Sequence, residues 1–365
     1  MNQPIRVLVV DDSALMRKLI PQMLARDASL QVVGTAMDGA FALQKIDELK
    51  PDVITLDLEM PRMDGLETLR EITRRRCAPV IVVSAHTTQG ASATFKALAV
   101  GALDFITKPS DGASSHIEEI GAELIAKIKA AAQAGVRAAQ LAPVVDLHRA
   151  AKQPLAKAAP TRVVAIGVST GGPNSLQYVL SRLPADFGGA LLIVQHMPQG
   201  FTEMFARRLD DSCAIQVKEA CSGDLLLAGR ALICPGNRHM RVRRMPLGEV
   251  VVLSDEERVN GHRPSVDVLF RSAVQEFGHR AIAVLMTGMG EDGAEGMGAV
   301  KAAGGLTIAQ DADSCIVFGM PRAAIERGYA ARVVALDALA NTLHAQCGSV
   351  RRQRPTLPLR PPAML

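Results

Sequence analysis

Tryptophan is absent from this chain of 365 residues, and aromatic residues make up only 3% of it. The hydrophobic cores must therefore be built from valine, isoleucine, leucine, alanine and methionine, a composition that is typical of parallel α/β sheets. Hydrophobic residues make up 48% of the sequence and charged residues 21%, as in ordinary globular proteins. The length is sufficient for two or three domains, each with a core of its own.

Other features that the sequence lacks exclude several classes of protein. The six cysteines form no C-x-x-C pair and no zinc-site spacing, which indicates reduced thiols. No apolar run approaches the roughly 18 residues of a membrane span, and the start M-N-Q-P-I-R-V-L lacks the features of a signal peptide. The net charge of +4 is small for this length and argues against nucleic acid as the main partner. We therefore expect a cytoplasmic protein without membrane insertion.

Short apolar runs alternate with helical patterns from residue 5 onward. The expected strands of this first block are Ile5–Val10, Gln31–Ala36, Val53–Leu58, Val80–Ala85 and Asp104–Thr107. Five successive units of strand and helix predict a flavodoxin-like fold, with a five-stranded parallel sheet and helices on both faces.

A second alternation begins near residue 161. Its expected strands are Val163–Val168, Ala190–Gln195, Arg280–Met286, Leu306–Ala309 and Arg332–Leu336, which predict a doubly wound, mostly parallel α/β domain. The run M-R-V-R-R-M-P-L-G-E-V-V-V-L between the second and third of these strands is broken by Pro-Leu-Gly, which predicts a β-hairpin.

The composition also predicts where the domains begin and end. We expect domains at residues 1–130 and 161–347, with a linker at 131–160 and a tail at 348–365. The linker is rich in alanine, glutamine, proline and basic residues and has no apolar period. The tail has four prolines and four arginines, and we expect it to be disordered.

Polar side chains stand at the ends of four strands in the first block. Asp11 and Asp12 follow the first strand, Asp57 ends the third, Ser84 ends the fourth and Lys108 follows the fifth. Because functional groups of a doubly wound sheet gather at the carboxyl ends of its strands, we expect these residues to meet. Three carboxylates suit Mg²⁺, and one of them can attack phosphorus while the cation offsets the charge. For any single position a helix cap or a solvated turn is the better explanation, but the set of positions favours a site.

Residues 5–128 resemble a response-regulator receiver domain. The resemblance rests on V-D-D-S, the D-L-E-M-P-R-M-D-G segment around Asp57, Ser84, and the K-P pair with Lys108. It implies that Asp57 accepts phosphate from a histidine kinase, and that the two acids after the first strand bind Mg²⁺ together with Asp57. It also implies that Ser84 senses the phosphoryl group, that Lys108 pairs with it, and that Phe105 is the switch aromatic.

A serine stands at the first strand-to-helix turn of the second block. The run from Gly167 to Gly171 has the G-x-S-x-G form of a nucleophile elbow around Ser169. The helix that follows offers amide groups to a developing oxyanion. Two alternatives remain open, namely a dinucleotide-phosphate turn, although the full G-x-G-x-x-G is missing, and a simple helix cap.

A serine nucleophile needs a base and an acid to orient that base. His196 ends the strand Ala190–Gln195, at the rim where Ser169 is expected. The strand at 280–286 is followed by Glu291 and Asp292, although an aspartate before glycine is often only a turn residue. Serine, histidine and aspartate then all lie just past strands of one sheet. Three rival histidines have less obvious strand-end settings: His239, His262 and His279.

Residues 162–347 resemble the catalytic domain of chemotaxis protein-glutamate methylesterases. The matching runs are G-V-S-T-G-G-P, Q-H-M-P, P-G-N-R-H-M, H-R-P-S-V-D-V-L-F, T-G-M-G-E-D-G and F-G-M-P. The resemblance implies roles for five residues: Ser169 as nucleophile, His196 as base, Asp292 as its orienting partner, and Thr170 and the Met289 backbone near the oxyanion. It gives no role to Glu291.

The two resemblances together imply a methylesterase that phosphorylation controls. The substrates would be γ-methyl esters of glutamates on the helical cytoplasmic part of chemoreceptors, with glutamine deamidation by the same acyl chemistry. The histidine kinase of the chemosensory array would donate phosphate, the receiver would need Mg²⁺, and the esterase would need no cofactor. One alternative is a regulatory binding module on a vestigial esterase fold. A DNA-binding regulator is disfavoured, because the second block has α/β units and no helix-turn-helix pattern.

Overall fold

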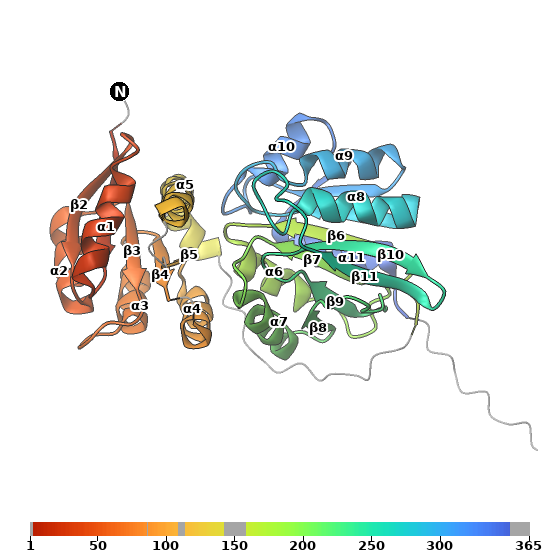
Figure 1. Cartoon of the computed structure of the whole chain (residues 1–365), viewed down its shortest axis with the longest axis horizontal. Coiled ribbons are helices and arrows are strands. Elements are labelled where there is room, and N and C mark those ends of the chain that lie inside the picture. Colours follow the sequence, from red (N-terminus) through yellow and green to blue (C-terminus); the bar gives the residue numbers. More distant parts are fainter. Residues whose placement is uncertain (1–2, 86, 109–113, 142–157, 351–365) are drawn as a thin grey trace, which may run out of the picture.

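A computed structural model describes residues 3–85, 87–108, 114–141 and 158–350 of the chain. Two parallel sheets covered by helices lie side by side, and a two-stranded hairpin flanks the second sheet (Figure 1). This confirms the expected fold class of two linked α/β units with one hairpin. Within the described residues, no helix is both long and apolar enough to cross a membrane.

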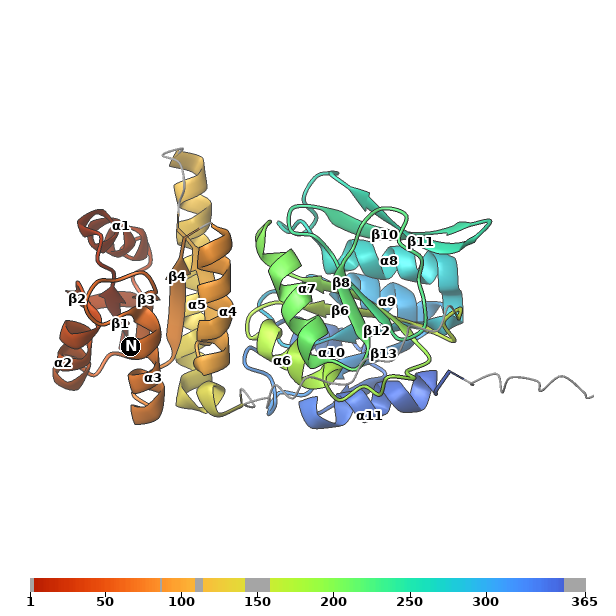
Figure 2. The same cartoon turned by 90° about the horizontal axis from the view of Figure 1, so that it is seen from below.

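The N-terminal unit is built from five strands, which are β1 (Ile5–Val10), β2 (Leu30–Ala36), β3 (Val53–Asp57), β4 (Val80–Ser84) and β5 (Asp104–Thr107). Its helices are α1 (Ala14–Leu24), α2 (Gly39–Leu49), α3 (Gly65–Arg75), α4 (Thr88–Val100) and α5 (Ser114–Leu141). The parallel strand order is β2-β1-β3-β4-β5, as in flavodoxin-like folds. α1 packs against α5, while α3 packs between α2 and α4 (Figure 2).

Apolar runs and capping residues explain where these elements form. The strands β3 and β4 are buried throughout their length, as their unbroken apolar runs predict. The side chains of Ser13, Asp38, Asp64 and Thr87 each accept a hydrogen bond from an amide in the first turn of the following helix. Such caps satisfy amides that have no partner within the helix. The observed strands of this unit differ from the expected ones by at most one residue at an end.

The sheet of the C-terminal unit has seven strands, which are β6 (Val163–Val168), β7 (Ala190–Gln195), β8 (Gln216–Glu219), β9 (Arg230–Ile233), β12 (Ala281–Leu285), β13 (Leu306–Gln310) and β14 (Arg332–Val334). The parallel strand order is β14-β13-β12-β6-β7-β9-β8, so the chain order reverses beside β6. Ligands of open α/β sheets bind at such switch points. The helices of this unit are α6 (Gly172–Leu180), α7 (Phe201–Ser212), α8 (Val266–Phe277), the short 3₁₀ helix η1 (Gly278–Arg280), α9 (Ala294–Ala302), α10 (Met320–Glu326) and α11 (Leu336–Cys347).

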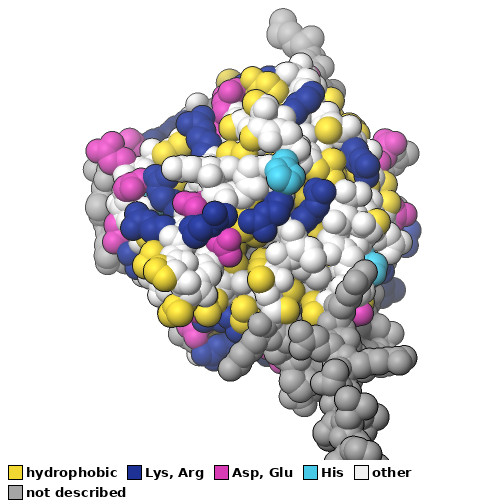
Figure 3. Space-filling view, turned by 90° about the vertical axis from the view of Figure 1, so that its right-hand side faces the viewer, with side chains coloured by type: hydrophobic (Ala, Val, Ile, Leu, Met, Phe, Trp, Pro, Cys, Tyr) yellow, Lys and Arg dark blue, Asp and Glu magenta, His cyan; other side chains and the backbone are white. Residues whose placement is uncertain are grey.

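The hairpin consists of β10 (His239–Met245) and β11 (Gly248–Ser254), which pair antiparallel as the sequence predicts. Its tip residue Leu247 is 91% exposed. The end of the molecule that faces away from the N-terminal unit carries a band of lysine and arginine side chains among apolar ones (Figure 3). The strands β8 and β9 were not expected from the sequence.

The helix α5 crosses the expected domain boundary at residue 130. It continues to Leu141, with non-helical backbone only at Gly135, whose φ is 58°. The rest of the expected linker, from residue 142 to 157, lies outside the described residues. The expected tail is described only to residue 350, where the Val350 amide donates to the Asp186 carbonyl at 2.7 Å.

Four phenylalanines join the two units in this aromatic-poor chain. Phe95 of α4 stacks on Phe205 of α7 with ring centroids 5.6 Å apart, and Phe105 of β5 stacks on Phe201 of α7 at 4.9 Å. The sequence has nine phenylalanines, so nearly half of them meet at this contact. Because α7 begins just after the loop that follows β7, the contact reaches the rim of the second sheet.

Polar contacts extend the same interface along α4 and α5. The Asn174 side-chain amide donates to the Leu98 carbonyl at 2.9 Å, and Arg258 forms an ion pair with Glu119 at 3.3 Å. Ile316 joins the apolar cluster that includes residues of α5. The α4, β5 and α5 side of the N-terminal unit therefore faces the loops at the carboxyl edge of the second sheet.

Candidate functional site

The carboxyl ends of β1 and β3 bring three carboxylates together. Val10 pairs with Leu56 in register, so the residues that follow these strands lie at one rim. Carboxylate oxygens of Asp11, Asp12 and Asp57 lie within 4.8 Å of one another, and Asp11 and Asp57 are buried. Three converging carboxylates fit Mg²⁺, which binds to carboxylates and retains several waters.

Lys108 lies against this cluster directly after β5. Its ammonium group is 2.8 Å from an oxygen of Asp57 and 3.1 Å from an oxygen of Asp11. Burial raises the pKa of Asp11, and the Lys108 charge offsets this only in part. Burial also acts to lower the pKa of Lys108, but the hydrogen bond to Asp57 and the charges of the two carboxylates outweigh it and raise this pKa. Lys108 brings one positive charge, in contact with two of the three carboxylates, and the cluster therefore favours a further cation.

The two expected sensing residues connect this rim to the interface. Ser84 is buried, and its hydroxyl accepts a hydrogen bond from the Thr94 hydroxyl at 2.7 Å, which ties the end of β4 to α4. Phe105 is buried on β5 with the Lys127 ammonium 5.4 Å above its ring, and it stacks on Phe201. Residues near the acidic cluster are thus in contact with the C-terminal unit.

The carboxyl ends of β6, β7 and β12 bring together the three residues expected to form a triad. Ser169 follows β6, and its amide donates to the Thr287 carbonyl at 3.0 Å. The His196 amide donates to the Val168 carbonyl at 3.0 Å, which places His196 beside the serine turn. The His196 Nε2 lies 2.9 Å from an oxygen of Asp292. The other ring nitrogen, Nδ1, is buried and has no hydrogen-bond partner among the described residues.

Hydrogen-bond donors from the segment that leads into the start of α8 hold the carboxylate of Asp292. Its carboxylate accepts hydrogen bonds from the Val266 amide at 2.7 Å, the Ser265 hydroxyl at 2.8 Å and the Asn260 side-chain amide at 3.0 Å. Burial acts to raise the pKa of Asp292, but the bond and charge of His196 and these donors outweigh it. The pKa of Asp292 therefore lies well below its usual range, and the group is a carboxylate at neutral pH.

Two of the rival residues, Glu291 and His239, are occupied elsewhere. The neighbouring acid, Glu291, is exposed and forms an ion pair with Arg327 at 2.6 Å. His239 is buried, with ring contacts to the Glu257 carbonyl at 2.9 Å and to the Ser265 amide at 3.2 Å. Of the two acids after β12, only Asp292 contacts His196 in the described part of the chain.

Glycines allow the serine turn and the loop after β12 to approach closely. Gly171, with φ 74°, caps α6, and no side chain makes a cap hydrogen bond there, which removes the helix-cap alternative for Ser169. A side chain at Gly288 would place its Cβ 2.8 Å from the Ser169 Cβ. Thr170 is buried, and its carbonyl accepts from the Thr287 hydroxyl at 3.0 Å. Met289 follows Gly288 directly, so the residues expected near the oxyanion lie on two segments that touch.

Two residues that adjoin the triad were given no role from the sequence, where His262 was considered only as a rival base and Asn260 not at all. The ring of His262 stacks on that of His196, with centroids 3.9 Å apart and planes 8° apart. Asn260 donates to Asp292 and also to Asp267, at 2.8 Å. Both lie on the loop between β11 and α8, away from the strand ends at which functional residues are expected. The sequence contains the run N-G-H-R-P, but this run does not follow an expected strand.

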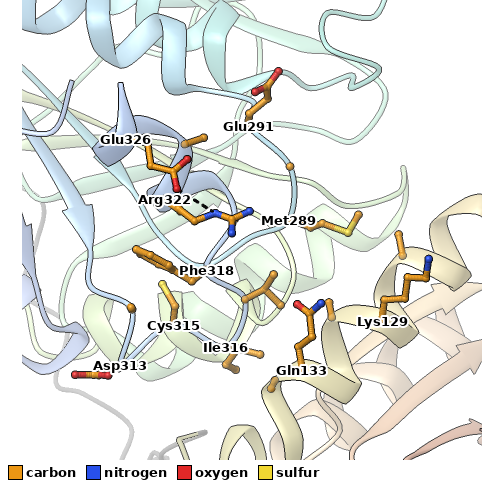
Figure 4. Close-up of a pocket in the computed structure, with 18 of the residues that line it drawn as sticks. Lys129, Gln133, Met289, Glu291, Asp313, Cys315, Ile316, Phe318, Arg322 and Glu326 are labelled. Atoms are coloured by element: carbon orange, nitrogen blue, oxygen red, sulfur yellow. Dashed lines mark ion pairs between the residues drawn. The ribbon is translucent and has the colours of Figure 1, made fainter. Parts of the chain in front are cut away.

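A cavity of about 1060 Å³ opens where the two units meet (Figure 4). Lys129 and Gln133 of α5 form one wall, and Met289, Ile316 and Phe318 belong to the wall from the C-terminal unit. None of the three triad residues lines this cavity, but Met289 follows Gly288, which packs against Ser169, so the cavity beside the serine turn is bounded in part by the N-terminal unit.

Comparison with known proteins identifies both units. A family model described as CheB methylesterase matches residues 164–343, and one described as response regulator receiver domain matches residues 7–117. The protein-glutamate methylesterase/protein-glutamine glutaminase 2 of Koribacter versatilis is 65% identical over 354 residues, covering 95% of this chain and 98% of the relative. A protein-glutamate methylesterase/protein-glutamine glutaminase of Symbiobacterium thermophilum is 47% identical over 360 residues, with coverage of 95% and 98%.

Solved structures include a similar protein. The catalytic domain of the Thermotoga maritima CheB methylesterase is 40% identical, with a TM-score of 0.49, over 51% of this chain and 98% of that domain. On the matches along nearly the whole chain, the protein belongs to the CheB methylesterase family, in which a receiver domain precedes the methylesterase domain.

Proposed function

We propose that this protein is a phosphorylation-controlled protein-glutamate methylesterase, and that it also acts as a protein-glutamine glutaminase, as its relatives are named. The observation that carries the proposal is the hydrogen bond between His196 and Asp292 beside the Ser169 turn. The substrates are glutamate γ-methyl esters on the helical cytoplasmic part of chemoreceptors, and the enzyme works in the cytoplasm.

The triad performs the reaction through an acyl-enzyme. The Ser169 Oγ attacks the ester carbonyl while its proton moves to the His196 Nδ1, the nitrogen that has no partner in the described structure. Asp292 holds the opposite nitrogen and stabilises the imidazolium that forms. His196 then gives the proton to departing methanol, or to ammonia when the substrate is an amide. Water, deprotonated by His196, releases the glutamate carboxylate.

The oxyanion forms where two segments touch. The amides of Thr170 and Met289 are our candidates for its donors, because neither amide makes another hydrogen bond in the described part of the chain. Gly288, between Thr287 and Met289, lets this segment approach Ser169. Donors that are fixed before the reaction stabilise the developing charge without reorganisation.

The receiver domain accepts phosphate on Asp57 from a histidine kinase of the chemosensory array. Asp11, Asp12 and Asp57 would hold Mg²⁺, and the bound cation would offset the charge of the phosphoryl oxygens. Lys108 is placed to pair with the phosphoryl group, because its ammonium already contacts Asp57. Ser84 lies at the end of the neighbouring strand, from which its hydroxyl can move to the phosphoryl oxygens.

The unphosphorylated receiver acts as a lid on the esterase. The α5 helix forms one wall of the cavity next to the serine turn, which supports this arrangement (Figure 4). Phe105 stacks on Phe201, so the switch aromatic touches the helix that follows the His196 loop. Because both units belong to one chain, docking is intramolecular, and the docked state is populated even when the interface is weak. Phosphorylation then needs to weaken docking only by a few kcal/mol to shift the population.

Release of methanol from methyl-labelled receptor membranes tests the activity. The full-length protein releases methanol, and Ser169→Ala reduces the rate by several orders of magnitude because the acyl-enzyme cannot form. The matched control is Ser181→Ala, which removes a hydroxyl that bonds only within its own helix end and leaves the rate unchanged. A wild-type protein that binds receptors without releasing methanol, even when phosphorylated, would instead be a regulatory binding module.

A further inference from the structure

The loop between β11 and α8 presents His262 in a fixed position. Val259 and His262 exchange two backbone hydrogen bonds, of 3.1 and 2.9 Å, around a two-residue turn. The turn residues Asn260 and Gly261 have φ of 54° and 77°, as the tight turns formed by Asn-Gly require. The Asn260 side-chain amide then donates to both Asp267 and Asp292, which anchors the turn to the triad.

This anchored turn covers one face of the catalytic imidazole. The ring of His262 lies parallel to that of His196, 3.9 Å from centroid to centroid and 8° from coplanar. The edge of the His196 ring is engaged by Asp292, so edge and face are held by different segments of the chain. The charged groups that also face His262 are Glu123 from α5 and Arg258 from its own loop.

His262 is uncharged under working conditions. Burial, as the largest cause, together with the nearby His196 and Arg258 lowers the pKa of His262 to about 4, although Asp292 and Glu123 act against this. Two stacked rings that both carried a proton would repel each other. One ring of the pair is therefore neutral whenever the other is an imidazolium.

We propose that His262 is a positioning residue for the esterase reaction, whose neutral ring fixes the plane of His196 and stabilises the imidazolium that forms there. This inference rests on the proposed function of Ser169, His196 and Asp292. The face of an aromatic ring is electron-rich and attracts a cation placed over it. The ring of His262 also keeps water from that face, so the positive charge is held by fixed groups.

The step in which the stack acts can be written with its charges balanced. The Ser169 Oγ–H bond breaks, its proton moves to the His196 Nδ1, the Oγ–C bond forms and the carbonyl electron pair moves to oxygen. The new positive charge lies between the Asp292 carboxylate and the face of His262. When the C–OCH₃ bond breaks, the proton passes to the methoxide oxygen and His196 is neutral again. Because the charge exists only during the reaction, the stack affects kcat and leaves KM unchanged.

Three substitutions in the full-length protein separate the contribution of the aromatic ring to the rate from the contributions of side-chain volume and charge. The variants are His262→Phe, His262→Leu and His262→Arg, each treated with Mg²⁺ and a small-molecule phosphodonor. Methanol release from methyl-labelled receptor membranes is measured from pH 5.5 to 9, where wild-type His262 is neutral. Thermal unfolding and phosphorylation of Asp57 show that each variant is folded.

We expect His262→Phe to keep kcat within about twofold, because a ring remains on the imidazole. His262→Leu lowers kcat about tenfold with KM unchanged, and the acid limb of the pH–rate profile moves to lower pH because the imidazolium has lost a stabilising face. His262→Arg lowers kcat most, since a permanent positive charge then faces the imidazolium. A purely structural role would leave the acid limb in place.

Equal kcat and equal acid limbs in His262→Phe and His262→Leu would overturn the inference, because the ring would then contribute nothing. Equal and severe losses in all three variants would also overturn it, since His262 would then be a reacting group. A wild-type protein that releases no methanol contradicts the proposed function itself, and this inference with it.

Discussion

The receiver and the esterase each bury an aspartate just past a strand, but they surround it differently. Asp292 accepts hydrogen bonds from a histidine, a hydroxyl and two kinds of amide, and its pKa is lowered. Asp11 shares one lysine with Asp57, and its pKa is raised. The charge of Asp292 is therefore balanced by groups of the chain itself, whereas the acidic cluster of the receiver keeps an excess of negative charge that a bound cation would offset. This difference is consistent with an esterase site that is preassembled and a receiver site that responds to a bound cation and a phosphoryl group.

The largest expected effect comes from the completed site. Asp292→Asn removes the carboxylate that orients His196, and we expect methanol release to fall about 10³- to 10⁴-fold while the fold is retained. Glu291→Gln is the matched control, because Glu291 is the adjacent acid and its exposed side chain forms an ion pair with Arg327. Normal activity in Asp292→Asn together with loss of activity in Glu291→Gln would show that Glu291, and not Asp292, orients His196.

The same carboxylate also sets a pH dependence of stability. Since the folded-state pKa of Asp292 lies below its unfolded value of about 3.9, its stabilising contribution is present above about pH 4 and is lost as the pH falls further. We expect Asp292→Asn to lower the free energy of unfolding by about 1–3 kcal/mol at pH 7, and by progressively less below pH 4. Urea unfolding of both proteins at several pH values measures this difference. A difference that stays constant down to pH 2 would contradict the lowered pKa.

The incomplete site predicts a response to metal. Mg²⁺ at about 100 times its dissociation constant is expected to stabilise the receiver by about 2.7 kcal/mol and to leave the esterase unchanged. Calorimetry that resolves the two domains measures the shift. Asp12→Asn removes an exposed ligand of the cluster and abolishes most of the shift without disturbing the core. Equal stabilisation of both domains would show non-specific binding.

The arrangement of the two sites predicts the effect of removing one. A fragment that begins near residue 150 is expected to demethylate receptors about tenfold faster than the unphosphorylated whole, which corresponds to ~1.4 kcal/mol of docking free energy. Thermal unfolding of the fragment checks that it is folded. A fragment that is no faster would contradict the lid and leave activation by the receiver, or recruitment to receptors, as the mechanism.

A single interface contact has the smallest expected effect. Glu119→Gln breaks an exposed ion pair with Arg258, and such pairs contribute about 0.2–1 kcal/mol. We expect the basal rate to rise at most about fivefold and the phosphorylated rate to stay unchanged. Glu118→Gln, one residue away on the same helix, is the control because its ion pair is with Arg26 inside the receiver. An equal rise in both variants would indicate a general effect of charge.

The sequence predicted all five strands of the first sheet and five of the seven strands of the second, because most of these are apolar runs between turn residues. It missed β8 and β9, since Gln-Val-Lys-Glu and Arg-Ala-Leu-Ile are too short and too mixed in polarity to give a periodic signal. It also did not predict that α5 continues past the expected boundary at residue 130. The expected linker begins with alanine-rich sequence, and alanine favours continuation of α5 to Leu141.

The sequence predicted those residues of the candidate sites that lie at the ends of strands or after them. The residues brought together at the two rims all have such positions, so the topology alone indicated their proximity. His262 and Asn260 come from a loop whose path depends on the Asn-Gly turn and on contacts with Asp292, which no local pattern encodes. The phenylalanine contact between the domains was equally hidden, because it depends on how two separate folds dock.

The most direct test of the account is methanol release by the full-length protein with and without a phosphodonor and Mg²⁺, with Asp57→Asn measured alongside. We predict that phosphorylation raises the rate of methanol release by the wild-type protein. Asp57→Asn keeps the basal rate, but its rate does not rise when the phosphodonor and Mg²⁺ are added. A wild-type rate that is the same in both conditions, or an Asp57→Asn protein that responds as the wild type does, would contradict the claim that Asp57 controls the esterase.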